Sequence, residues 1–341
     1  MVEPTEPTEP EMVVLNEQTL PMLEGSSEEA PFAERKKLEL KGKNITAVEL
    51  SSSSLIHLSL PLNKLVSLEF LSGLRSLTKL DLSNNPGLKD IKPVCQLTEL
   101  RVLDISFTNV KRIPSSFQKL LNLKAFMAKK CRIGTKYLKH LKGCKDLNTI
   151  VISDNPDIVD ISPLTDLIFL RKIAASNCGL LELPDLSRLF RLTELRIMDN
   201  KLYRLPEELS RCTRLRILDV RRNPLKDYGN IEPVGELHLI QLYLGATPLA
   251  IRADYRTTIL KMCASLAMLD GQKIAETSTR RRPGLKIANT PKAKDSAKAK
   301  GPQRRKAPQT KSTKRGGDGK ERTVKVEKAA PRVTTETSGW D

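Results

Sequence analysis

Apolar residues recur along this chain with one fixed spacing, LxxLxLxxNxL, in which x is any residue. The copy at 55–65 matches every position, and the copy at 77–88 matches after one inserted residue. Three further copies keep the asparagine and begin at Leu147, Leu192 and Leu215. Weaker copies change the asparagine but keep the apolar frame, and they cover 100–105, 123–128, 170–175 and 239–244, with a truncated first copy at 38–45.

The fourth position of the pattern serves as a marker for each unit. The markers lie 20 to 24 residues apart, at positions 38, 58, 80, 103, 126, 150, 173, 195, 218 and 242. Residues around each marker alternate between apolar and variable, which is the period of a β-strand. Because so short a strand is unstable alone, we expect the units to stack into one parallel sheet with a shared core. Segments such as IPSSFQKLLNL (113–123) should return the chain as short helical turns.

The asparagine follows the strand, where its amide can bond backbone groups that burial removes from water. Cys131 and Cys178 occupy this position in two weaker copies, so we interpret them as small substitutes for asparagine. The other cysteines are expected to fill the core. None of the six has metal-ligand spacing or forms a CxxC, which favours a reducing compartment and predicts neither metal nor cofactor.

Both ends of a stacked array must be covered, because the last unit would otherwise expose its core. Residues around 31–50 are expected to cover the first unit. At the other end, DYRTTILKMCASLAMLDG (254–271) predicts a cap with one apolar helical face, formed by Tyr255, Ile259, Leu260, Leu266 and Leu269.

The units IKPVCQLTELRVLDI (91–105) and ISPLTDLIFLRKI (161–173) resemble intracellular leucine-rich repeats of about 22 residues. That group includes the leucine-rich-repeat regulatory subunit of protein phosphatase 1 and the spliceosomal A-prime protein. The cap residues Tyr255, Leu266 and Asp270 also resemble its terminal motif. The resemblance implies an α/β leucine-rich-repeat solenoid, a curved horseshoe with a parallel concave sheet and short helical convex segments. It also implies that a protein partner binds the concave face.

Charge divides the chain into three parts. Residues 1–34 hold nine acidic and no basic residues, which predicts an acidic disordered head. Residues 35–275 form the predicted repeat domain, and 276–341 a basic disordered tail. The tail clusters are typical of nuclear localisation or nucleic-acid contact, although a solubilising extension would look similar. Their residues are Arg280, Arg281, Arg282, Arg304, Arg305, Lys306, Lys314 and Arg315.

Candidate partner contacts are the outward strand positions, one before each marker and one, three and four after it. In the central and later units an apolar ribbon runs beside a basic one, a combination enriched at protein interfaces. The candidates are Asp104, Phe107, Met127, Lys129, Lys130, Val151, Asp154, Arg196, Met198, Asp219, Arg221, Arg222 and Tyr243.

No phosphate loop, zinc-protease motif or nucleophile elbow occurs in the sequence, so we expect no enzymatic activity. No apolar run is long enough to cross a membrane.

The leading hypothesis is a scaffold, monomeric as a repeat domain, within a nuclear or nucleolar complex; a cytoplasmic location is the alternative. RNA or another polyanion is a candidate ligand of the tail. Two further hypotheses are an RNA-associated subunit of a ribonucleoprotein or ribosome-assembly complex, and a phosphatase regulatory subunit.

Overall fold

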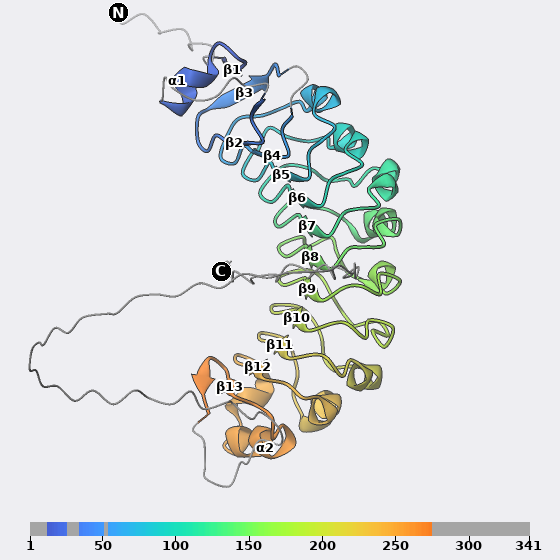
Figure 1. Ribbon diagram of the computed structural model, residues 1–341. Helices are drawn as coiled ribbons and strands as arrows, with labels where there is room; N and C mark the ends of the chain where they lie inside the picture. Colours follow the sequence, from blue (N-terminus) through green and yellow to red (C-terminus); the bar gives the residue numbers. More distant parts are fainter. Residues whose placement is uncertain (1–11, 26–33, 51–53, 275–341) are drawn as a thin grey trace, which may run out of the picture. The chain divides into compact units, whose positions relative to one another are not determined.

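The computed structural model of the chain describes residues 12–25, 34–50 and 54–274. The predicted basic tail and parts of the predicted head lie outside these residues. Among the described residues, twelve strands form one sheet in the order β14-β13-β12-β11-β10-β9-β8-β7-β6-β5-β4-β2 (Figure 1). Every pairing is parallel except that of β13 with β14. The strands are β2 (Lys37–Glu39), β4 (His57–Ser59), β5 (Lys79–Asp81), β6 (Val102–Asp104), β7 (Ala125–Met127), β8 (Thr149–Val151), β9 (Lys172–Ala174), β10 (Glu194–Arg196), β11 (Ile217–Asp219), β12 (Gln241–Tyr243), β13 (Met268–Leu269) and β14 (Gln272–Lys273).

The strand positions confirm the predicted repeat. All ten markers are the central residues of strands, and each pairs with the marker of the next unit, as Phe126 does with Ile150. Leu269 continues the row as an eleventh member because it pairs with Leu242. Each of these side chains is buried in one continuous core.

Short helical segments return the chain on the convex side, opposite the strands (Figure 1). Each one buries at least one apolar side chain, such as Phe117, whose ring centroid lies 5.3 Å from that of Phe126. The predicted convex turns are therefore confirmed, as 3-10 helices and not as α-helices. They are η2 (Glu69–Gly73), η3 (Lys92–Gln96), η4 (Ser115–Lys119), η5 (Thr135–Leu141), η6 (Ser162–Leu164), η7 (Glu207–Arg211), η8 (Tyr228–Glu236) and η9 (Pro248–Ile251).

The buried asparagines join neighbouring units through their amides. Asn155 Oδ1 accepts hydrogen bonds from the backbone N–H groups of Cys131 (3.1 Å) and Ile133 (2.8 Å) in the preceding unit. Its Nδ2 donates to the carbonyls of Ala128 (2.8 Å) and Ile152 (2.7 Å). One side chain thus satisfies four buried backbone groups. The equivalent asparagines, also buried, are Asn63, Asn85, Asn200 and Asn223.

The expected disorder of the whole segment 1–34 is wrong for residues 12–25. These form β1 (Val13–Leu15) and α1 (Leu20–Glu24), and β1 pairs in parallel with β3 (Ile45–Val48). Leu15 and Leu20 are buried in the common core, so this segment covers the N-terminal end together with β3. The acidic composition of the segment concealed this short apolar pattern.

The C-terminal cap has its predicted position but a different internal structure. The helix α2 (Tyr255–Met262) ends before Leu266, and Leu269 lies in the added strand β13, so the cap leucines do not share one helical face. Asp270 Oδ1 accepts hydrogen bonds from the N–H groups of Leu244 (2.7 Å) and Gly245 (2.8 Å). In inner units, the N–H group equivalent to that of Leu244 donates to a backbone carbonyl of the next strand. At the end of the array, the Asp270 carboxylate takes the place of that carbonyl.

Tyr255 holds this terminal carboxylate from the helix. Its hydroxyl donates to Asp270 Oδ2 at 2.6 Å, and burial together with this carboxylate raises the pKa of Tyr255. The tyrosine therefore remains a neutral hydrogen-bond donor, and it ties α2 to the last strand.

Replacing Asn155 by alanine should lower the free energy of unfolding by about 2–4 kcal/mol, because four buried backbone groups lose their partner. Thr108 occupies the same position in another unit and donates one hydrogen bond, to the Ile105 carbonyl at 2.7 Å. Thr108→Val should therefore cost only about 1 kcal/mol. Urea denaturation of both variants measures the difference, and equal losses would contradict this role of the asparagine.

Replacing Asp270 by alanine should fray the array from its C-terminal end, since interactions in a solenoid are mostly between neighbours. Hydrogen exchange should accelerate first in β12, at Leu244 and at Gly245, while β6 retains its protection. Glu236→Ala, which removes an exposed carboxylate from η8, is the control and should change neither region. Uniform protection along the array of the Asp270 variant would show that the cap is dispensable.

Candidate functional site

Strand register places the predicted concave residues in columns. The residues that follow the markers face outward side by side on consecutive strands. From β6 to β12 this column reads Asp104, Met127, Val151, Ala174, Arg196, Asp219 and Tyr243. Most are half-buried, whereas Arg196 is exposed and Ala174 and Asp219 are buried.

A central patch of apolar side chains lies on β6 to β9, and it consists of Val102, Ala125, Met127, Val151 and Ala174. Met127 and Val151 are paired in register, as the sequence predicted for adjacent units. The structure separates them from Met198 by β9, whose outward side chains are the charged Lys172 and the small Ala174, so the expected apolar ribbon is not continuous.

Phe107 stands beside this patch with two lysines over its ring. Its side chain is 39% exposed, and the Nζ atoms of Lys129 and Lys130 lie 5.7 and 5.9 Å from the ring centroid. Lys129 Nζ also lies 3.6 Å from Asp154 Oδ2. All four residues were predicted contacts, and the structure brings them together.

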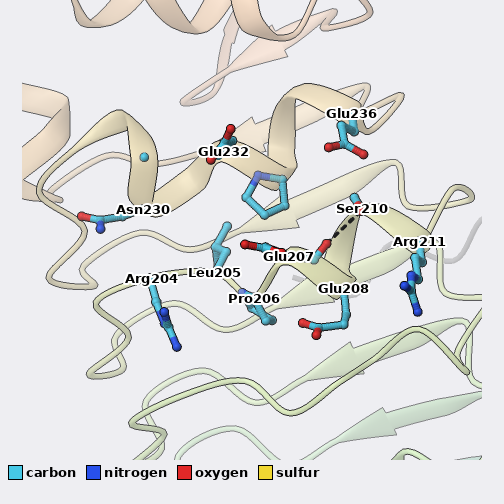
Figure 2. A pocket seen from close by; sticks show the side chains of 12 residues that line it. Arg204, Leu205, Pro206, Glu207, Glu208, Ser210, Arg211, Asn230, Glu232 and Glu236 are labelled. Atoms are coloured by element: carbon cyan, nitrogen blue, oxygen red, sulfur yellow. Dashed lines mark hydrogen bonds between the residues drawn. The ribbon is translucent and has the colours of Figure 1, made fainter.

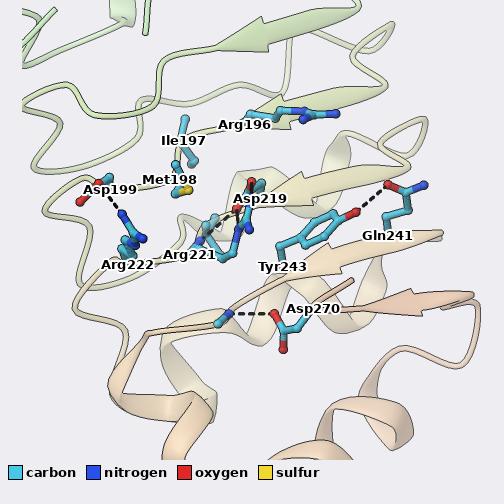
Figure 3. Close-up of polar contacts among 12 residues, drawn as sticks. Arg196, Ile197, Met198, Asp199, Asp219, Arg221, Arg222, Gln241, Tyr243 and Asp270 are labelled. Carbon is cyan, nitrogen blue, oxygen red and sulfur yellow. Dashed lines mark hydrogen bonds and ion pairs between the residues drawn. The ribbon is translucent and has the colours of Figure 1, made fainter. Parts of the chain in front are cut away.

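Arg221 in the C-terminal half is already paired with a carboxylate (Figure 3). Arg221 donates to both carboxylate oxygens of Asp219, at 2.9 and 2.7 Å, and its guanidinium lies 5.0 Å from the ring centroid of Tyr243. Asp219 is only 3% exposed beneath it, so the expectation that Asp219 faces a partner is wrong. Its carboxylate orients Arg221 instead.

Other cations of this half have carboxylate partners too. Arg222 lies 3.3 Å from Asp199, and Glu194 bridges Arg196 (2.6 Å) and Lys172 (3.1 Å). The basic ribbon expected from the sequence is therefore largely neutralised. Pattern alone could not reveal this, because several of these partners come from different units.

Acidic residues continue the same column toward the N-terminal end. Asp81 and Asp104 pair in register, and each accepts the backbone N–H two residues later, from Ser83 (2.9 Å) and Ser106 (2.8 Å). Burial raises the pKa of Asp104 despite this hydrogen bond. The central patch therefore has carboxylates on one side and paired arginines on the other.

A polar cleft of about 720 Å³ opens on the convex side between η7 and η8 (Figure 2). Carboxylates from both segments line it, including Glu207, Glu208 and Glu232. Sequence reasoning missed this cleft, because it arises only where convex segments of two units pack together. No group of three or more His, Cys, Asp or Glu residues suited to a metal occurs in the described part of the chain.

Comparisons with known proteins agree with this geometry. No family model matches the chain. A stretch of 103 residues is 30% identical to the acidic leucine-rich nuclear phosphoprotein 32-related protein 1 of Oryza sativa subsp. japonica, which is 30% of this chain and 22% of that protein. The chain is a leucine-rich-repeat protein. The match spans about a fifth of the relative's length, so the similarity concerns the repeat and does not extend to the relative's other parts.

Solved structures share the leucine-rich-repeat fold at low sequence identity. The TLR13–ssRNA13 complex aligns with a TM-score of 0.56 and 24% identity over 69% of this chain and 36% of that one. The functional domain of InlJ from Listeria monocytogenes aligns with a TM-score of 0.54 and 20% identity over 73% and 56%. At these identities the likeness concerns the fold.

The six cysteines of the leucine-rich-repeat domain are buried free thiols. Cys131 donates to the Ile105 carbonyl at 3.1 Å and Cys178 to the Ile152 carbonyl at 3.4 Å, which confirms them as substitutes for asparagine. Burial raises the pKa of Cys144 to about 12 and those of Cys178, Cys212 and Cys263 to about 11. These thiols are structural. In the described residues we find no helix with the length and hydrophobicity of a membrane span.

Asp104→Asn should stabilise the leucine-rich-repeat domain at neutral pH, because the amide oxygen can still accept from Ser106 while the desolvated charge is removed. A carboxyl whose folded pKa is raised costs stability as pH rises through that pKa. The advantage of the variant should therefore shrink as pH falls below it. Urea denaturation of both proteins between pH 3 and 7 measures this, and a pH-independent difference would contradict it.

Proposed function

We propose that this protein is a non-enzymatic scaffold whose concave face binds a protein partner, centred on the central patch. The observation that carries the proposal is the in-register apolar run of Met127, Val151 and Ala174, with Phe107 exposed beside it. Aromatic and Met side chains in a partly exposed cluster are typical of interface centres.

The surrounding charges favour a protein over RNA on this face. Lys129, Arg196 and Arg221 each lie beside a carboxylate, so little positive charge remains to neutralise phosphates. Paired groups of both signs suit the polar rim of a protein interface. We assign the rim to Asp104, Lys130, Asp154, Met198, Arg222 and Tyr243, with Asp219 as the residue that positions Arg221.

We further propose a nuclear or nucleolar location. The two basic clusters of 280–315 and the name of the nuclear phosphoprotein-related relative support it. The tail lies outside the described residues, and its contact with an import receptor or with RNA is part of the proposal. The ribonucleoprotein and phosphatase-regulator hypotheses use the same two surfaces. They differ from the leading proposal in which molecule binds the concave face or the tail.

The double substitution Met127→Glu and Val151→Glu should abolish partner binding. The control carries Val66→Glu and Leu181→Glu, exposed apolar positions off the concave face that are 64% and 56% exposed. Affinity capture of each full-length protein, followed by quantitative mass spectrometry, should show partners lost at least about tenfold from the first variant only. Both variants should unfold within about 5 °C of the wild type, because these positions lie outside the core.

Nuclease treatment before capture separates the alternatives. The proposal requires the same partners to remain after nuclease, whereas their loss would favour the ribonucleoprotein hypothesis. Undiminished capture by the Met127/Val151 variant would show that the concave face is not the interface.

A further inference from the structure

A second cleft, of about 470 Å³, opens on the flank of the array between the sheet and the convex segments, and we name it the flank notch. Four cations line it, and they come from two neighbouring units. Lys111 and Arg112 follow β6, whereas Arg132 and Lys136 follow β7. A third unit contributes one carboxylate, Asp157, after β8.

A glycine lines the notch at a position where the neighbouring units carry a side chain. Gly134 follows the buried Ile133, and the equivalent positions of the neighbouring units carry Lys111 and Val159. The Gly134 backbone is extended, with φ −95° and ψ 157°, so any residue could adopt it. A Cβ placed there would meet nothing closer than Asp157, at 3.8 Å. Folding does not require glycine here, and its small size leaves the cleft open.

Among the described residues, the cations of the flank notch outnumber the one carboxylate that lines it, in contrast to the paired charges of the concave face. Within the described residues, Lys111, Arg112, Arg132 and Lys136 form no ion pair, although Lys136 Nζ lies 5.2 Å from the Tyr137 ring centroid. Four cations around one small cleft, with Asp157 as the one carboxylate lining it, repel each other. An anion bound in the notch would relieve this repulsion.

Arg132 also adopts a backbone conformation that its residue type disfavours. Its φ is 61°, in the left-handed region that glycine and asparagine adopt more easily, at a cost of about 1–2 kcal/mol for other residues. The flanking N–H groups of Cys131 and Ile133 both donate to Asn155 Oδ1, which holds the backbone in place. A guanidinium thus stands at the notch where asparagine or glycine would stabilise the fold more.

We propose that the flank notch binds the phosphoryl group of a phosphorylated protein segment. A phosphoryl group offers nearly two negative charges and three acceptor oxygens, which suits two guanidinium groups and two ammonium groups around a small cleft. Asp157 at the rim can accept a hydrogen bond from a peptide N–H. This proposal does not depend on the concave-face function.

Nucleic acid fits the flank notch less well. Lys136 lies over the Tyr137 ring and the His140 ring approaches it at 6.2 Å, so this aromatic ring offers a base little room to stack. The next unit presents Asp157, Asp160 and the exposed Val159, where a continuing phosphate backbone would need cations.

The test is an NMR titration of the full-length protein with a synthetic peptide of glycine and serine that carries one phosphoserine. Saturable shifts are expected at the backbone amides of Arg132 and Thr135, and the unphosphorylated copy should produce none. These two amides report on the notch itself, so peptide that binds the basic tail does not contribute to their shifts. Inorganic phosphate should bind at least about tenfold more weakly than the phosphopeptide.

Three variants separate the notch from charge in general. Gly134→Leu fills the cleft and Arg132→Asn removes a guanidinium, so each should weaken binding about tenfold or more. Lys139→Gln removes an exposed charge from the same helix η5 outside the cleft and should change binding less than twofold. Arg132→Asn should unfold at the same or a higher temperature, since asparagine suits φ 61°.

Several outcomes would overturn the proposal. These are the absence of shifts with the phosphopeptide, equal binding of the unphosphorylated copy or of inorganic phosphate, and unchanged binding by Gly134→Leu. Tighter binding of a 12-nucleotide RNA at these amides would assign the notch to nucleic acid. The Met127/Val151 double variant should bind the phosphopeptide as the wild type does. The two proposals can therefore fail independently of each other.

Discussion

Each unit buries backbone amides and carbonyls where the chain leaves its strand, and those groups must find partners inside the core. Asn155 bonds four such groups, three of them in the preceding unit and one, the Ile152 carbonyl, in its own. Cysteine and threonine supply fewer at the same position, as Cys131 and Thr108 show with their bonds to the Ile105 carbonyl. Units whose side chain at this position makes fewer hydrogen bonds therefore depend on neighbouring units with asparagine, and the array is stable as a whole.

This repeated connection also arranges the surface. Because the strands pair marker to marker, residues at equal positions of successive units form columns on the concave face and on the flank. A candidate site arises where the residue type changes along such a column. On the concave face the column becomes apolar at Met127 and Val151, and on the flank Gly134 has no side chain.

The two faces differ in how their charges are balanced. On the concave face Arg221 shields Asp219 and stacks on Tyr243, so its polar groups are held in place before any partner arrives. Preorganised side chains lose less conformational entropy on binding. On the flank, Arg112 and Arg132 have no such partners among the described residues. The first arrangement suits a broad protein surface, and the second suits the phosphoryl group of a protein segment.

The sequence by itself determined the strand markers, the asparagine position and the place of the C-terminal cap, because a period of 20 to 24 residues with a buried asparagine is a local signal. It also placed Met127 and Val151 side by side, since register follows from the period. Only the tertiary structure decided the rest. The ordering of Leu15 and Leu20, the use of Asp270 as a terminal acceptor and the neutralisation of Arg222 by Asp199 depend on contacts between distant residues. The flank notch likewise depends on three units meeting around one missing side chain, and such encounters leave no periodic trace in the chain.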